Sequence, residues 1–145
     1  MSSPDVPTYP EEFVGWRGWT LDAKGLLHSV NDNILWTPGQ EFEAVCSLGR
    51  HHEFVPWAKC QCGIYTTKTL KKLRANGYHD VGVVGLVSIW GHIVDGGEGY
   101  RSEFAYPRVI YVPHLMWRLV EPLREYDVPI KLLNPYTGEP ETDDQ

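Results

Sequence analysis

Long apolar runs are missing from this chain of 145 residues. No segment approaches the roughly 20 consecutive apolar residues that a membrane-spanning helix requires. The first residues also lack the basic start and apolar stretch of a secretory signal peptide. We therefore expect a cytoplasmic protein that has no membrane partner.

Positive charge is scarce as well, since 13 Lys and Arg face 19 Asp and Glu and leave a formal net charge of −6. Nucleic-acid affinity comes largely from Lys and Arg that displace counterions from phosphates. This balance argues against a general nucleic-acid binder. A local exception is the segment 67–76, whose basic groups form either a phosphate-binding face or, in the favoured interpretation, a solvated helix face. These groups are Lys68, Lys71, Lys72 and Arg74.

Low hydrophobicity, which marks disordered chains, is absent too: 42% of the residues are hydrophobic and 22% are charged. The length is typical of a single domain. Proline-rich and acidic ends suggest a flexible N-terminal tail over residues 1–12 and a flexible acidic C-terminal tail over residues 134–145. The ordered domain is expected over residues 13–133.

Short runs rich in β-branched and aromatic residues, separated by Gly, Pro and Asn, predict strands joined by tight turns. The clearest pair is a hairpin of Val81–Val94 and Tyr100–Val112. One helix is predicted over Thr67–Asn76, with a threonine cap at its start and Gly77 at its end. A second begins near Pro113 and carries an apolar stripe. The predicted fold class is α+β, with a curved antiparallel sheet or small β-barrel, two helices and a zinc-stapled loop.

Cysteine is limited to three residues, which cannot all pair in disulfides. Cys46, Cys60 and Cys62 share a short segment with His51 and His52, and three cysteines with one histidine are a common structural zinc shell. Gly63 permits a close backbone approach behind the last cysteine. We predict a zinc site of Cys46, His52, Cys60 and Cys62, with His51 as the alternative ligand. Three separate buried thiols are the competing interpretation.

The order His51-His52-Glu53, then Pro56, then the pair Cys60 and Cys62 partly resembles the His-x-Glu and Pro-Cys-x-x-Cys signature of zinc deaminases. In those enzymes a glutamate moves protons and water completes the metal shell. The two halves are too close together here, and Cys46 fills the fourth position. A zinc-dependent hydrolase or deaminase is therefore kept only as an alternative, with no catalytic residue assigned.

Three motifs together resemble a family of small uncharacterised proteins from actinobacteria and their phages. They are the metal-binding stretch ending in Cys-x-Cys-Gly-Ile-Tyr at Tyr65, the Trp-Gly-x-Ile-Val segment within Gly85–Val94, and the Gly-Tyr-Arg-x-x-x-Ala-Tyr-Pro segment over Gly99–Pro107. The resemblance covers most of the predicted domain. It supports the same metal ligands and implies no activity.

Aromatic residues are plentiful, with 6 Trp, 8 Tyr and 4 Phe. Large rings either fill a core or line a recognition surface, and composition does not separate these uses. If the hairpin turn is centred on Gly97, Arg101 faces Ile93 and Glu103 faces Gly91, so both charges share one side. The two charges on that side predict either a ligand or partner surface or a surface ion pair between the strands. The predicted surface consists of Trp16, Trp19, Trp36, Arg101 and Glu103.

The leading functional prediction is a small zinc-stabilised binding or adaptor module that acts on a host or phage protein partner. The first alternative is a nucleic-acid-binding protein that uses the Lys68–Arg74 helix face, and the second is the zinc enzyme above. The sequence indicates neither the partner nor the oligomeric state.

Overall fold

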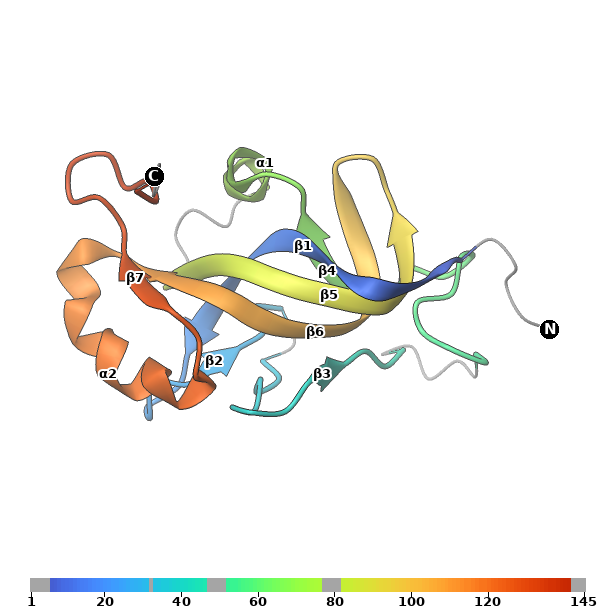
Figure 1. Ribbon diagram of the computed structural model, residues 1–145, viewed down its shortest axis with the longest axis horizontal. Helices are drawn as coiled ribbons and strands as arrows, with labels where there is room; N and C mark the ends of the chain where they lie inside the picture. The colour runs from blue at the N-terminus through green and yellow to red at the C-terminus, as the bar shows by residue number, and fades with distance from the viewer. Residues whose placement is uncertain (1–5, 32, 47–51, 77–81, 142–145) are drawn as a thin grey trace.

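The computed structural model describes residues 6–31, 33–46, 52–76 and 82–141. The strands form one mixed sheet, with α1 on one side and helical turns around α2 at one end (Figure 1). The predicted α+β class is confirmed. The elements are β1 (Thr8–Leu21), β2 (Leu27–His28), β3 (Phe42–Glu43), β4 (Ile64–Thr67), α1 (Leu70–Ala75), β5 (Val83–Asp95), β6 (Gly99–Val112), the 3₁₀ turn η2 (His114–Leu119), α2 (Val120–Leu123), the 3₁₀ turn η3 (Arg124–Tyr126) and β7 (Ile130–Leu132). None of the helices in these ranges has the length and apolar character that a membrane span needs.

Four strands close into a ring. The long strands β5 and β6 run lengthwise through the molecule (Figure 1) and pair with each other, while β5 also pairs with β1. The short strand β4 pairs with β6 and meets β1 through the single pair Trp16 and Thr67. The strand β7 joins β6 in parallel, so the sheet is mixed. Three of the four strand pairs in the ring have several paired residues, and the fourth, between β1 and β4, has one.

The strands β3 and β4 lie end to end along one edge of β6. Ala44, just after β3, donates its backbone N–H to the carbonyl of Glu103 at 2.9 Å. Ile64, the first residue of β4, pairs with Ser102, the next residue of β6. The chain therefore leaves the sheet after Ala44 and returns to it at Ile64, at neighbouring ladder positions. The two ends of the connection, called the 45–63 loop below, are thus fixed side by side.

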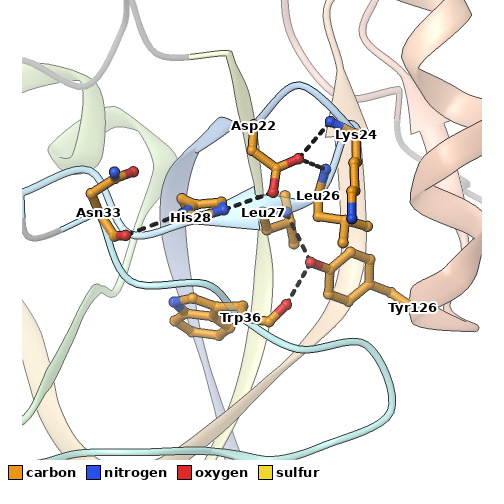
Figure 2. Close-up of polar contacts among 8 residues, drawn as sticks. All are labelled: Asp22, Lys24, Leu26, Leu27, His28, Asn33, Trp36 and Tyr126. Carbon is orange, nitrogen blue, oxygen red and sulfur yellow. Dashed lines mark hydrogen bonds and ion pairs between the residues drawn. The ribbon is translucent and has the colours of Figure 1, made fainter.

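The hydroxyl of Tyr126 connects η3 to β2 and to the segment before β3 (Figure 2). It accepts the backbone N–H of Leu27 at 2.8 Å and donates to the carbonyl of Trp36 at 2.6 Å. Burial raises the pKa of Tyr126 to about 12, so the phenol stays neutral and keeps its proton for the second bond. This hydroxyl holds β2 and the segment before β3 at a fixed spacing.

The β1–β2 turn carries an ion pair between Asp22 and His28 (Figure 2). The Nε2 atom of His28 lies 2.8 Å from Oδ2 of Asp22, and its Nδ1 atom lies 3.1 Å from the carbonyl oxygen of Asn33. Both partners are acceptors, so this arrangement favours the protonated ring, in which both nitrogens donate. Hydrogen bonding to Asp22 raises the pKa of His28. The backbone N–H of Leu26 and then His28 lower the pKa of Asp22.

We predict that this pair gives a pH-dependent stability. Because the pKa of His28 is raised on folding, its contribution is complete below about pH 6.5 and is lost as the pH rises through the folded-state pKa. Asp22 has a lowered pKa, so its own contribution is lost on acidification below about pH 3.8. Urea unfolding of the wild type and His28→Gln tests this. The stability difference between them is expected to be larger at pH 5.5 than at pH 8.5, and an equal difference at both pH values contradicts the assignment.

Both helices differ from their predicted forms. The helix α1 begins at Leu70, and its cap is Thr69, whose hydroxyl accepts the backbone N–H of Lys72 at 3.1 Å. The predicted start at Thr67 is wrong because Thr67 is the last residue of β4 and pairs with Gly99 of β6. The predicted end at Gly77 lies outside the described residues. The segment after Pro113 is mostly 3₁₀ turns around the short α2, not one kinked α-helix.

The hairpin register also differs from the prediction near the turn. Gly96 donates to the carbonyl of Gly99 at 2.8 Å, which centres the turn half a residue later than expected. Arg101 therefore faces Val94 and not Ile93. An irregularity between Trp90 and Ile93 then restores the predicted register further along the strands.

The two predicted tails make contacts with the domain. The strand β1 begins at Thr8, which pairs with His92. At the other end, the carboxylate of Glu139 forms an ion pair with Arg74 of α1, and Arg74 also donates to the carbonyl of Gly138 at 2.7 Å. These contacts lie in the ranges predicted as tails, and the flexibility of the tails stays a prediction.

Candidate metal centre

Four potential metal ligands meet where the 45–63 loop leaves and rejoins the sheet. Cys46 follows β3, His52 lies in the loop, and Cys60 and Cys62 precede β4. The ligand atoms of all four lie within 4.8 Å of one another. The sulfur atoms of Cys46 and Cys60 are 3.7 Å apart. These are the residues predicted from the sequence, whereas the alternative His51 lies outside the described part of the chain.

The surroundings of these atoms fit a bound metal ion. Cys60 and Cys62 are 5% and 9% exposed. The Nε2 atom of His52 is buried and has no hydrogen-bond partner among the described residues. A buried ring nitrogen without a partner is costly, so it points to a ligand at that position. The ring is also held in place, because it stacks on Trp57 with 5.2 Å between centroids and 1° between planes.

The thiols also have the electrostatics of metal ligands. The pKa of Cys60 is lowered to about 6, mainly by hydrogen bonding to the neighbouring imidazole of His52. Burial raises the pKa of Cys62, although the backbone N–H of Trp57 points at its sulfur at 3.4 Å and works in the opposite direction. Cys60 therefore loses its proton readily, whereas burial favours the neutral thiol of Cys62 unless a cation lies beside its sulfur.

Arg101 of β6 orients the cysteine turn. Its Nη1 atom donates to the carbonyls of Cys60 and Cys62 at 2.5 and 2.8 Å, and to that of Trp57 at 3.4 Å. One guanidinium nitrogen thus contacts three carbonyl oxygens of residues that lie outside the strands. The sequence predicted that Arg101 lies on a ligand surface beside Glu103. In the structure, Arg101 instead donates to backbone carbonyls of the 45–63 loop.

We predict that Arg101→Gln weakens metal binding by about 10- to 100-fold, because the ligands lose the group that orients their backbone. A titration against a chromogenic chelator measures this affinity. Arg108→Gln is the matched control: Arg108 lies on the same strand and pairs with Glu12 at 2.9 Å, away from the loop. Equal metal affinity in the Arg101 variant and the wild type contradicts the positioning role.

A second anchor holds the outer part of the loop. The ring of Phe54 stacks on His92 of β5, with 3.7 Å between centroids. The Oε1 atom of Glu103 in turn accepts the backbone N–H of His92 at 3.0 Å and lies 2.8 Å from its Nδ1 atom. The carboxylate of Glu103 therefore binds His92 at the irregular part of β5. Arg101 instead binds the backbone of the 45–63 loop.

The tryptophans of the predicted ligand surface lie mainly in the core. Trp19 and Trp36 are 0% and 1% exposed. Trp36 stacks on Phe42 of β3 with 4.4 Å between centroids. Trp16 is half-buried against Tyr111. These rings pack the sheet and its flanking loops, and the structure does not bring them together with Arg101 and Glu103 on one surface.

Most basic side chains of the predicted phosphate-binding face form ion pairs with acidic residues of the same chain. Lys68 lies 2.9 Å from Asp95, and Lys72 lies 2.5 Å from Glu98. Arg74 pairs with Glu139, as described above. Three of the four cationic groups named for phosphate contacts thus contact carboxylates of the same chain.

No family model, curated protein or solved structure matches the chain. Its class therefore follows from fold and site alone. It is an α+β domain in which a Cys₃His cluster lies at the base of a loop that interrupts a strand.

Proposed function

We propose that this protein is a zinc-stapled binding module whose metal shapes a recognition surface for a protein partner. The carrying observation is the convergence of Cys46, His52, Cys60 and Cys62 within 4.8 Å. Three thiolates and one imidazole suit zinc, and four protein ligands complete its tetrahedral shell. A complete shell leaves no position for a reactive water, which favours a structural role for the metal.

The proposed zinc site would stabilise the 45–63 loop. The loop 45–63 belongs to no helix or strand in its described residues, so few ladder hydrogen bonds hold it. Its ends are adjacent on β6, and metal ligands from both ends and the middle tie it down. Ordering such a loop costs about 1–2 kcal/mol per residue in backbone entropy, which metal binding offsets.

The alternative functions have weaker support. Glu53 would be the proton carrier of a zinc enzyme, but it is exposed beside a ligand set that already has four members. The basic helix face would contact nucleic acid, but Lys68, Lys72 and Arg74 already contact carboxylates. A protein partner remains the best-supported target.

Cobalt substitution tests the metal role. Adding Co²⁺ to metal-free protein under reducing conditions is expected to give intense visible absorption typical of tetrahedral coordination, with ultraviolet thiolate-to-cobalt bands. One equivalent of Zn²⁺ is expected to abolish both. Weak octahedral spectra, or spectra unchanged by His52→Ala, contradict the proposed shell.

A further inference from the structure

Strand pairing brings the two ends of the 45–63 loop together, and a cysteine lies near each end. Ala44 and Ile64 bind neighbouring residues of β6. Cys46 follows Ala44 by two residues, and Cys60 precedes Ile64 by four. The sulfur atoms of these two cysteines lie 3.7 Å apart. Because the pairing with β6 uses no metal ligand, we expect the two thiols to stay close neighbours with or without a bound metal ion.

These two sulfur atoms are the pair best placed to form a disulfide. They would have to approach by roughly 1.7 Å to reach the S–S bond length of about 2.05 Å, a movement that side-chain rotation can supply. Cys60 and Cys62 are separated by one residue, so a bridge between them would close a small ring with strained geometry. The sulfur of Cys62 also accepts the backbone N–H of Trp57 at 3.4 Å. A bridge between Cys46 and Cys60 leaves that contact in place.

The thiols differ in their access to solvent. Cys46 is partly exposed, whereas Cys60 and Cys62 are 5% and 9% exposed. Val45, the residue before Cys46, is 68% exposed, so the chain meets solvent at this end of the loop. Cysteines that sense oxidants are typically solvent-accessible thiolates beside a second cysteine that resolves the first oxidation product. Cys46 has the position of the first thiol, and Cys60 has that of the second.

Loss of these two thiolates would dismantle the proposed zinc shell. Only His52 and Cys62 would remain of the four ligands, and a structural zinc site needs four. The disulfide would keep the base of the loop closed, since it joins the same two segments as the metal. The middle of the loop would lose its tie at His52, although Phe54 would still stack on His92 of β5. Oxidation would thus change the middle of the loop while its ends stay fixed.

We propose that Cys46 and Cys60 form an oxidation site for hydroperoxides, and that their disulfide releases the zinc ion. With hydrogen peroxide, the thiolate of Cys46 attacks one peroxide oxygen: an S–O bond forms, the O–O bond breaks, and hydroxide leaves. The thiolate of Cys60 then attacks the sulfur of Cys46, which forms the S–S bond, breaks the S–O bond and releases a second hydroxide. Two electrons pass from the two sulfurs to the peroxide. This inference rests on the proposed function and names a regulation of the same metal site.

Hydrogen peroxide added to the zinc-loaded protein tests the proposal. A chromogenic zinc indicator is expected to report one equivalent of zinc per chain beyond that released without peroxide, and the intact mass is expected to fall by two hydrogen atoms. A thiol reductant and added Zn²⁺ are expected to restore the zinc-loaded protein. Retention of zinc and reduced thiols in excess peroxide overturns the proposal, and so does zinc release with sulfinic acid and no disulfide.

Peptide mapping identifies the bridge. Trypsin gives fragment 25–50, which holds Cys46, and fragment 60–68, which holds the other two cysteines. The oxidised protein is expected to give these two fragments joined, and tandem mass spectrometry that breaks the chain between Cys60 and Cys62 is expected to locate the link on Cys60. A bridge within fragment 60–68, a link on Cys62, or a bridge between two chains overturns the assignment.

Two serine variants form a matched pair, because each removes one proposed zinc ligand. In metal-free protein, Cys62→Ser keeps the oxidisable pair and is expected to form an intrachain disulfide at about the wild-type rate. Cys46→Ser keeps Cys60 and Cys62 and is expected to form an intrachain disulfide at least 10-fold more slowly. Equal rates for the two variants overturn the proposal. Mapping of the bridge in the wild type decides the same question if neither variant folds.

The outcomes separate this inference from the proposed function. Purified protein that contains no zinc but forms the bridge between Cys46 and Cys60 contradicts the zinc staple, and with it the release step, and leaves the oxidation site in place. Zinc-loaded protein that keeps both its zinc and its thiols in excess peroxide overturns this inference alone.

Discussion

Replacement of Cys60 with serine is expected to abolish stoichiometric zinc binding and to lower the melting temperature by more than about 10 °C. The residue lies 3.7 Å from the sulfur of Cys46 and is 5% exposed, so a hydroxyl there is a poor ligand in a site built for thiolates. Binding energy of a structural zinc is folding energy, and a loss of several kcal/mol shifts the transition by this amount. Calorimetry and zinc analysis of the purified variant measure both effects.

The metal-free wild type is the control for this prediction. If Cys60 acts through the metal, chelated wild-type protein is expected to melt close to the Cys60→Ser variant, and added Zn²⁺ is expected to rescue only the wild type. A variant that melts well below the metal-free wild type would assign the effect to packing. Equal melting temperatures of the metal-free and zinc-loaded wild type contradict the staple itself.

Substitution of Gly63 with alanine is expected to have the second-largest effect. Gly63 has a φ of +119°, and a Cβ there would lie 2.9 Å from Cβ of Pro56 and 3.0 Å from Cβ of Arg101. The change combines backbone strain of about 1–3 kcal/mol with a clash at the centre of the metal loop. We expect a total loss of about 2–4 kcal/mol in unfolding free energy, together with weaker zinc binding.

The matched control is Gly97→Ala in the β5–β6 turn. Gly97 also has a positive φ, of +92°, but no atom lies within 4 Å of the Cβ it would gain. This variant should show backbone strain alone and unchanged zinc affinity. Urea unfolding and zinc titration of both variants compare them. Equal losses of stability, with zinc affinity unchanged in both, would show that the close approach to Pro56 and Arg101 does not matter.

The four candidate ligands were accessible from the sequence because they lie close together along the chain. Residue type restricts metal ligands strongly, and every cysteine of the protein belongs to the cluster. The surrounding support was less accessible. Arg101 lies on a distant strand, and its contacts depend on a turn geometry that shifts the hairpin register by one residue. No local pattern reports such a shift, since alternation looks the same on either side of it.

Short elements escaped prediction for a related reason. The strand β4 has only four residues, Ile64–Thr67, and its strand state depends on pairing with Gly99–Ser102 of β6. The same pairing displaces the helix cap from Thr67 to Thr69, because a residue in a ladder cannot also begin a helix. The parallel strand β7 likewise exists only through its contact with β6. Tertiary pairing decides these short segments, and local propensity does not.

The most direct test of the central claim is the zinc content of protein purified without chelators, measured by elemental analysis. The account predicts one zinc per chain, retained through dialysis and lost from the Cys60→Ser variant. Protein that folds and contains no stoichiometric zinc would contradict the account, and the cluster of Cys46, His52, Cys60 and Cys62 would then need another explanation.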